Sequence, residues 1–454
     1  MFQYFYHMQR YLIKDILLVN EGKIVPTDVL IEGERFGKIA PQIQVKTQVT
    51  EIDGHGKYLL PGIIDDQVHF REPGYTHKAT IHTESRAAVA GGVTSYMEMP
   101  NTYPPAVKLE ILQQKYEIAA RHSLANYSFY LGAANHHQDE ILRLNAHRHE
   151  ICGLKIFMGS STGELLVDDI STLENIFASC ELPITTHCED EALIRLRLQQ
   201  ARAQKGEALT AADHPWIRNE EVCYRSSSFA VSLAKRYGTR LHVLHLTTAD
   251  EMHLFSADIP LAEKQITAEV CVHHLHFTAD AYSKLGNLIK CNPAIKAAHH
   301  REALWQALLE GRIDVIATDH APHTWEEKQQ PYLQAPAGLP LVQHGLLLML
   351  EYFRNGKISL EQIVEKMCHH PAICFQIRDR GFVREGYFAD AVIVDMQGTT
   401  PVDKEHLFYK CKWSPFESHR FPARISHTFV SGHLAYVEGK FNESQMGKRL
   451  LFNR

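Results

Sequence analysis

Eight short β-rich runs alternate with helical stretches along this chain of 454 residues, and that alternation is the strongest constraint on its fold. The runs lie at 63–69, 93–99, 127–131, 154–157, 183–187, 241–245, 266–272 and 313–319, and four of them end in a histidine or an aspartate. Between them, helical periodicity appears at 83–90, 109–121, 171–179, 224–237 and 301–310. Strand and helix that alternate in this way predict an α/β fold, a (β/α)8 TIM-like barrel.

Two terminal segments fall outside this alternation. Residues 11–58 and 382–440 alternate apolar and polar positions and carry turn signals such as Asn20-Glu21-Gly22 and Val430-Ser431-Gly432. They are predicted to form the two halves of one small β-sandwich that the barrel interrupts. The expected domains are 1–58 for the first half, 59–380 for a metal-dependent catalytic barrel, and 381–454 for the second half and a C-terminal tail.

The composition is that of a globular protein without a nucleic acid or membrane partner. Hydrophobic residues make up 45% and charged residues 22%, with a net charge of -6 and a pI near 6.6. The segment from Met1 to Tyr11 is aromatic and polar, and no apolar run approaches the roughly 18 residues that span a bilayer. A cytoplasmic location is therefore expected.

The cysteines indicate neither a disulfide framework nor a zinc ribbon. Their number, nine, is odd, and no CxxC pair occurs. We expect reduced and mostly buried thiols.

Several of the predicted strands bring chemically useful residues to their carboxyl ends, where barrel enzymes place their chemistry. These residues are His69, Lys155, His187, His245 and Asp319. Together they predict a binuclear metal centre at one rim of the barrel. A protonated lysine cannot bind a cation, but a lysine carboxylated by CO2 becomes an anionic bridging ligand. The alternative for Lys155 is a barrel lysine that pairs with an acid.

Two motifs carry a resemblance to a known family, namely His69-Phe70-Arg71-Glu72-Pro73-Gly74 and Met99-Pro100-Asn101-Thr102. With them, the chain from about residue 58 to 323 resembles the dihydroorotases of the amidohydrolase superfamily, in the type I or hydantoinase-like branch. One position departs from the family pattern Asp-x-His-x-His. Gln67 stands where the first histidine is expected, and its neutral amide makes it a doubtful metal ligand.

The resemblance implies a function and roles for individual residues. The expected activity is the reversible cyclisation of N-carbamoyl-L-aspartate to (S)-dihydroorotate in pyrimidine biosynthesis, with a metal-held hydroxide as nucleophile and Asp319 as general base and then general acid. Arg71 would hold the substrate carboxylate through its planar guanidinium. Asn101, Asn292 and His323 would be further substrate donors. Zinc is the expected metal, with roughly one or two ions per chain, and Lys155 would be carboxylated.

Several alternatives stay open. An allantoinase or hydantoinase would share the barrel, but neutral hydantoins need no carboxylate clamp such as Arg71 and Asn101. A non-catalytic subunit that holds an aspartate transcarbamoylase is compatible with Gln67. A homodimer and a transcarbamoylase partner are both possible. His273 and His274 would lie behind the metal ligands or simply in the core.

Overall fold

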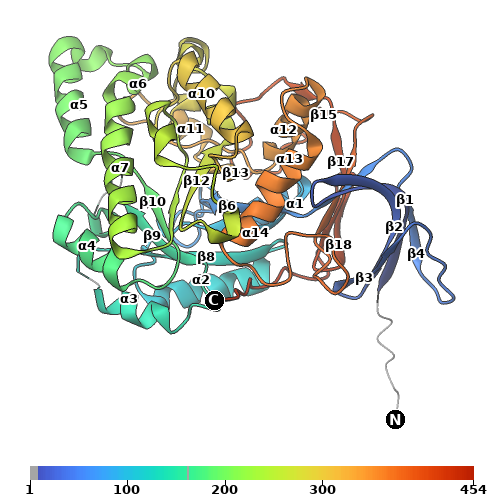
Figure 1. Ribbon diagram of the computed structural model, residues 1–454. Helices are drawn as coiled ribbons and strands as arrows, with labels where there is room; N and C mark the ends of the chain where they lie inside the picture. Colours follow the sequence, from blue (N-terminus) through green and yellow to red (C-terminus); the bar gives the residue numbers. More distant parts are fainter. Residues whose placement is uncertain (1–8, 137, 161–162) are drawn as a thin grey trace.

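The computed structural model describes residues 9–136, 138–160 and 163–454 and consists of a parallel barrel beside a second, mostly antiparallel sheet (Figure 1). The terminal segments of the chain build the second sheet, whereas the middle of the chain builds the barrel and its helices. The predicted fold class is confirmed.

The barrel strands follow one another in sequence order around an eight-stranded sheet with parallel pairing. Each overlaps one of the β-rich runs expected from the sequence. The strands are β6 (Ile63–Val68), β7 (Val93–Glu98), β8 (Asn126–Gly132), β9 (Gly153–Phe157), β10 (Ile184–His187), β11 (Leu241–Val243), β12 (Ile266–Cys271) and β13 (Val315–Ala317).

The barrel closes between its first and last strands, just past their carboxyl ends. Val68 forms a parallel bridge with His320, and the His69 N–H donates to the His320 carbonyl at 2.7 Å. One layer deeper, the Thr318 hydroxyl donates to the Asp65 carboxylate at 2.6 Å. This junction fixes the first-strand motif against the segment that carries Asp319.

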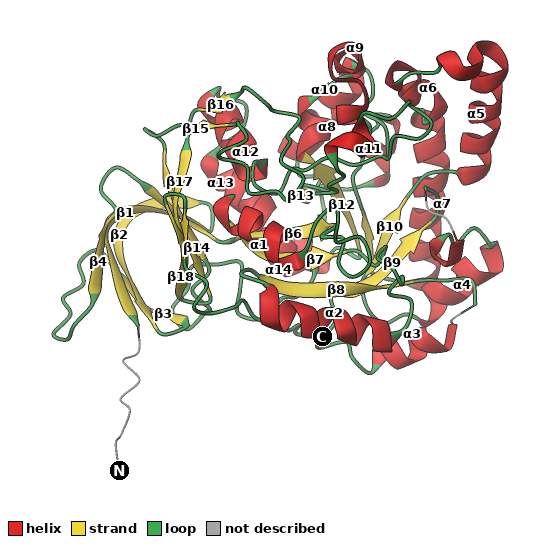
Figure 2. Ribbon diagram, turned by 180° about the vertical axis from the view of Figure 1, so that it is seen from behind, coloured by secondary structure: helices red, strands yellow, loops and turns green. Residues whose placement is uncertain are grey.

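Helices cover the outside of the barrel (Figure 2), and an apolar layer of strand and helix side chains lies between them. The expected helical stretches overlap α1, α2, α4, α7 and α10. The helices are α1 (Ile81–Ala90), α2 (Leu109–His122), α3 (Gln138–Asn145), α4 (Ile170–Ser179), α5 (Glu191–Lys205), α6 (His214–Ile217), α7 (Glu220–Tyr237), α8 (Val272–His276), α9 (Tyr282–Leu285), α10 (Ala298–Leu309), α11 (Trp325–Lys328), α12 (Gly345–Arg354), α13 (Leu360–Val364) and α14 (His370–Cys374).

The two termini share one nine-stranded sheet, in which β5 joins the halves by pairing with both β1 and β14. Apolar residues from both halves pack into one core, including Ile13, Ile31, Ile393 and Phe429. The sheet contains β1 (Arg10–Asn20), β2 (Lys23–Glu32), β3 (Arg35–Ala40), β4 (Thr50–Asp53), β5 (Tyr58–Pro61), β14 (Ala391–Asp395), β17 (Arg424–Val430), β18 (His433–Val437) and β19 (Lys440–Phe441), and β15 (Thr400–Pro401) pairs separately with β16 (Arg420–Phe421). The exact domain limits stay a prediction.

Two further observations concern possible membrane spans and the cysteines. Among the described residues, no helix combines the length and the apolar character that crossing a membrane requires. All nine cysteines lie in the described ranges and are free, and all but Cys411 are buried.

A buried ion pair supports the strand ends that carry the two sequence motifs. Lys115 of α2 is fully buried, and its Nζ lies 2.5 Å from Glu98 Oε2 and donates to the Met99 carbonyl at 2.9 Å. The other oxygen of Glu98 accepts the Phe70 N–H at 3.0 Å. One helix side chain therefore holds β7, and through Glu98 it also holds the end of β6.

We expect Lys115→Met to lower the free energy of unfolding by about 3–5 kcal/mol, because it leaves the Glu98 carboxylate buried without its cation. Urea denaturation measures the change, and the exposed Lys108→Met serves as the matched control, with an expected change within about 0.5 kcal/mol. Equal stabilities of the two variants would show that the pair does not support these strand ends.

Candidate active site

The sequence-predicted metal ligands lie together at the rim formed by the carboxyl ends of the barrel strands. All of them are nearly closed off from solvent, with exposed fractions between 1% and 8%; they are Gln67, His69, Lys155, His187, His245 and Asp319. Two of these residues, His245 and Asp319, have left-handed backbone conformations with φ of 39° and 49°, as has Arg71 with 68°. Such strained conformations persist only where the surroundings impose them, and they cluster at functional sites.

His69 and Asp319 form one half of the rim. His69 Nδ1 lies 2.7 Å from Asn101 Oδ1 and donates to it, so that Nε2 of the neutral ring keeps its lone pair. That Nε2 lies 3.1 Å from Asp319 Oδ1, and burial lowers the pKa of His69, which favours the neutral ring. Two acceptors at this distance repel each other unless a cation lies between them. The pair therefore fits a metal site.

Gln67 lies beside this pair, but its amide is turned away from a ligand role. Its Nε2 donates to Asp319 Oδ1 at 3.1 Å, and the Cys271 thiol faces its Oε1 at 3.8 Å. The carboxylate beside Nε2 needs a donor and the thiol beside Oε1 needs an acceptor, so both contacts support this assignment of the amide nitrogen and oxygen. In this arrangement Gln67 supplies Asp319 with a hydrogen bond and supplies no oxygen to a cation.

His187 and His245 form the other half of the rim. His187 Nδ1 lies 3.0 Å from His245 Nε2, while the opposite nitrogen of His187 donates to Glu189 at 2.8 Å. Burial would raise the pKa of Glu189, but Arg218 at 2.5 Å and His187 outweigh it and hold that pKa well below its usual range. An imidazole oriented by a carboxylate is typical of a metal ligand, because the carboxylate fixes the tautomer.

Lys155 lies between the two halves without a hydrogen-bond partner for its Nζ among the described residues. Burial lowers its pKa to about 7, although the Asp319 and Glu269 carboxylates oppose that shift. A substantial fraction of the amine is therefore uncharged near neutral pH, which is the form that reacts with CO2. The acid partner that would make Lys155 a structural lysine is not among the described residues within hydrogen-bond reach.

Arg71 and His323 lie next to this rim. Arg71 Nε donates to the Pro322 carbonyl at 3.1 Å, and its Nη2 lies 3.1 Å from His323 Nε2. Burial lowers the pKa of Arg71 to about 10, so the guanidinium still stays charged near neutral pH. On the far side of His323, Lys78 Nζ donates to Nδ1 at 3.0 Å and also pairs with Glu327.

Asn292, His273 and His274 were also singled out from the sequence. Asn292 Oδ1 lies 3.1 Å from His214 Nε2, and within the described residues no hydrogen bond joins Asn292 to Arg71 or His323. His274 donates to the Pro293 carbonyl at 3.1 Å. Both histidines are buried, and burial lowers the pKa of His273 to about 4, although the Asp319 carboxylate opposes that shift.

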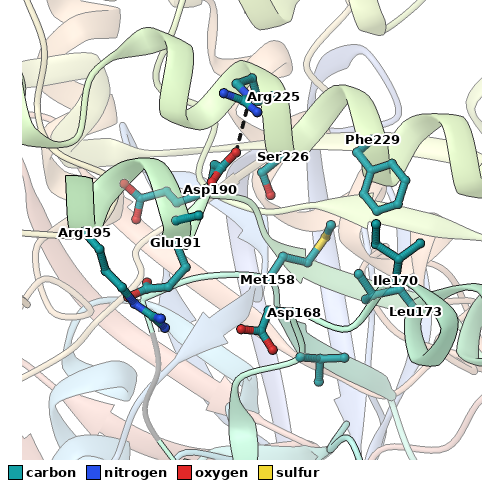
Figure 3. Close-up of a pocket in the computed structure, with 13 residues that line it drawn as sticks. Met158, Asp168, Ile170, Leu173, Asp190, Glu191, Arg195, Arg225, Ser226 and Phe229 are labelled. Atoms are coloured by element: carbon teal, nitrogen blue, oxygen red, sulfur yellow. Dashed lines mark hydrogen bonds and ion pairs between the residues drawn. The ribbon is translucent and has the colours of Figure 1, made fainter. Parts of the chain in front are cut away.

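A cavity of about 430 Å³ opens beside the rim, between α4, α5 and α7. Figure 3 shows its lining, in which Arg225 pairs with Asp190 while Ile170 and Phe229 form an apolar side. Glu189, which contacts His187 at the rim, is also one of the residues that line this cavity. Neither the expected metal ligands nor Arg71 line this cavity.

Three residues that contact the side chains of the site and orient them were not identified from the sequence. They are Glu189, which orients His187; Arg218, which pairs with Glu189; and Lys78, which contacts His323. Glu189 follows His187 by two positions at the end of a strand, a spacing that could have indicated it. Arg218 and Lys78 come from distant loops and carry no comparable signal.

Comparison with known proteins places this site in a family context. The family model described as "Amidohydrolase family" matches residues 58–435. The chain is 33% identical over 437 residues to "Dihydroorotase" of Listeria welshimeri, covering 95% of this chain and 99% of the relative. It is 32% identical over 445 residues to "Dihydroorotase" of Carboxydothermus hydrogenoformans, covering 93% and 96%.

A solved structure resembles the fold over its whole length. The L-hydantoinase (dihydropyrimidinase) from Arthrobacter aurescens superposes with a TM-score of 0.91 at 25% identity, covering 98% of this chain and 100% of that protein.

We expect Gln67→His to raise the affinity for divalent metal at the half of the rim that contains His69 and Asp319. An imidazole is a stronger ligand for zinc-like ions than the neutral amide that now faces Asp319. Metal titration of both proteins, with the exposed Gln306→His as control, measures the change. Two ions bound with equal tightness by the natural chain, and no change in the variant, would contradict the prediction.

Proposed function

The chain belongs to the amidohydrolase family, and on this premise we propose that it is a dihydroorotase. It would interconvert (S)-dihydroorotate and N-carbamoyl-L-aspartate in pyrimidine biosynthesis, as a hydrolase that acts on a cyclic amide. The main support for this proposal is Arg71, which is charged, buried and next to the rim. Its planar guanidinium can form two parallel hydrogen bonds to the ring carboxylate of the substrate.

We propose that the rim holds a divalent metal, with zinc as the expected ion and roughly one or two per chain. His187 and His245 would hold one ion, and His69 and Asp319 the other, with a carboxylated Lys155 between them. Three observations support the assignment: the lone pairs of His69 Nε2 and Asp319 Oδ1 face each other, His187 Nδ1 lies 3.0 Å from His245 Nε2, and Lys155 Nζ has no partner among the described residues. Gln67 is left out of the ligand set because its amide nitrogen faces Asp319. When bound, the metal lowers the pKa of water and polarises a carbonyl.

We propose that hydrogen-bond donors around Arg71 also bind the substrate. Asn101 accepts from His69 through its oxygen, so its amide nitrogen remains available to donate to the substrate. Lys78 donates to His323 Nδ1, so Nε2 carries the proton of the neutral ring, and it lies 3.0 Å from the Ala337 carbonyl and 3.1 Å from Arg71 Nη2. His323 is proposed as a further donor to the substrate. Asn292 is proposed to contact the pyrimidine ring from the loop after α9, with support from the family resemblance alone.

Asp319 is proposed to move the proton. In the hydrolytic direction it takes a proton from the attacking water and passes it to the ring nitrogen as the ring C–N bond breaks. The product carries one more carboxylate than the substrate, so one proton is released overall. Gln67 would keep the Asp319 carboxylate in position through its hydrogen bond to Oδ1.

Hydantoinase activity is the second candidate, and the overall likeness to the Arthrobacter aurescens enzyme favours it. A neutral hydantoin leaves the Arg71 guanidinium without a counterion in a buried site, which is costly. Comparing turnover of dihydroorotate with that of hydantoin decides between the two. A third possibility, a non-catalytic subunit of a transcarbamoylase assembly, predicts turnover of neither.

The cellular location and the partners of the protein are also proposed here. Nine free cysteines support a reducing compartment, and we propose the cytoplasm. A homodimer and a complex with aspartate transcarbamoylase are proposed from the family resemblance, and light scattering with and without the transcarbamoylase tests both.

We expect Arg71→Lys to lower kcat/KM for dihydroorotate by roughly 10- to 100-fold, because an ammonium cannot reproduce the bidentate contact to a carboxylate. Steady-state kinetics measure this, with metal content determined in parallel to show that the rim is intact. The exposed Arg121→Lys is the control. An unchanged kcat/KM in Arg71→Lys would remove Arg71 from carboxylate binding.

Asp319→Asn should lower kcat by about two to four orders of magnitude, since the carboxamide keeps the shape of the side chain but cannot transfer the proton. Substrate binding, measured by calorimetry, should persist if the variant keeps its metal. The exposed Asp258→Asn should behave like the natural chain. Near-normal turnover of the Asp319 variant would contradict the proposed proton transfer.

Lys155→Ala should lose metal and activity together, because the bridging anion disappears. Short carboxylates such as acetate or propionate should restore part of both, and the conservative Lys155→Arg should not respond to them. Crystallographic density for an unmodified lysine beside two fully occupied metal sites would end the proposal of a carboxylated lysine.

A further inference from the structure

Three ionisable side chains lie inside the barrel, one layer below the rim. Asp66 comes from β6, His242 from β11 and Glu269 from β12, and their exposed fractions are 0%, 2% and 0%. Asp66 immediately precedes Gln67, and His242 precedes His245 by three positions, so the cluster lies deeper than the rim residues. Branched apolar side chains normally fill this part of a barrel. None of the three has a role in the proposed reaction.

Four of their polar atoms lack a partner in the described part of the chain, whereas the other oxygen of Glu269, Oε1, accepts the His245 N–H at 2.9 Å and the Cys271 thiol at 3.4 Å. Asp66 Oδ1 and Oδ2, Glu269 Oε2 and His242 Nε2 have no hydrogen-bond partner among the residues that the structure describes. His242 Nε2 lies 3.1 Å from Asp66 Oδ2 and 3.7 Å from Glu269 Oε2. All three ligand atoms lie within 4.8 Å of one another. Buried carboxylate oxygens without donors are costly, so something must compensate them.

The tautomer of His242 leaves the inward nitrogen available. The Thr267 hydroxyl lies 2.7 Å from His242 Nδ1 and 3.4 Å from the Leu241 carbonyl, so it can accept the Nδ1–H of His242 while it donates to that carbonyl. In that tautomer, Nε2 of the neutral ring directs its lone pair at the two carboxylates. A histidine whose other nitrogen donates to a neighbouring oxygen is the usual arrangement for metal ligands.

We propose that Asp66, His242 and Glu269 bind a divalent transition-metal ion of the Zn²⁺ or Mn²⁺ class inside the barrel. Metal–ligand bonds of about 2.0–2.2 Å in a tetrahedral shell place neighbouring ligand atoms about 3.3–3.6 Å apart. The observed 3.1 Å and 3.7 Å lie on either side of that spacing. One imidazole and two carboxylates suit these ions. The proposal does not depend on which reaction the rim catalyses.

The charge balance supports a dication. The buried carboxylates of Asp66 and Glu269 repel each other, and His242 Nε2 lies within 3.7 Å of an oxygen of each. Without a metal, an imidazolium compensates only part of the negative charge. A dication replaces that proton and compensates both carboxylates.

The ion would link strands that only the folded barrel brings together. The pairing of β6 with β7 shifts register between Asp65 and Val68, at the same place where Asp66 reaches into the barrel. A metal on Asp66 would fix this irregular segment to β11 and β12. Because Gln67 and His69 continue the same segment, the buried ion would also hold the rim in place.

Anomalous diffraction from crystals of the natural protein grown with Zn²⁺ or Mn²⁺ tests the site directly. The expected result is a peak bounded by the Asp66 carboxylate, His242 Nε2 and Glu269 Oε2, separate from any peak at the rim. Anomalous peaks at the rim with none at this position would overturn the proposal and leave an imidazolium as the sole compensation.

Metal counting in solution is the second measurement. In a background that lacks the rim imidazoles, with His69→Ala, His187→Ala and His245→Ala, the chain should still bind about one ion and gain thermal stability from it. Adding His242→Gln should abolish both effects. His344→Gln removes a buried histidine elsewhere and is the matched control. Equal zinc binding with and without His242→Gln would overturn the proposal, and failure of the reaction assay would not affect it.

Discussion

Closure of the barrel between β6 and β13 is the constraint on which the rest of the site depends. The His69 N–H donates to the His320 carbonyl, and Asp65 receives hydrogen bonds from Thr318. These contacts join residues about 250 positions apart and bring His69 within 3.1 Å of Asp319. Parallel strands leave their carboxyl ends at one edge, so closing this junction completes a ring of side chains.

Burial gives this ring its chemical character. At the low exposure of the rim, an imidazole stays neutral, a lysine amine loses its proton more easily and a carboxylate needs a nearby cation. The pKa directions of His69 and Lys155 follow from this cause, and Glu189 stays ionised because Arg218 and His187 lie against it. A solvent-exposed ring of the same residues would lack these properties.

The same physical conditions apply one layer deeper, at Asp66, His242 and Glu269. In both layers, buried carboxylate and imidazole atoms converge, and in both a neighbouring oxygen contacts the other nitrogen of a histidine. The rim faces the substrate and the inner cluster faces the barrel core. If both bind metal, the inner ion would support the segment that carries Gln67 and His69.

The sequence by itself determined the fold class and the membership of the rim. Its eight β-rich runs all overlap observed strands, and the residues at their ends, such as His69, Lys155 and His245, lie together as expected. Periodicity and strand-end position are local properties, so they can be recognised without a structure. The motif around Arg71 and Asn101 likewise indicated the family that the comparisons bear out.

Only the tertiary structure decided how individual side chains face one another. The orientation of the Gln67 amide depends on Asp319 and Cys271, which lie more than 200 positions away. The convergence of Asp66, His242 and Glu269 depends on which side of each strand points inward after the register shift in β6. Hydrogen-bond partners and burial arise from packing between distant segments, and no pattern along the chain encodes them.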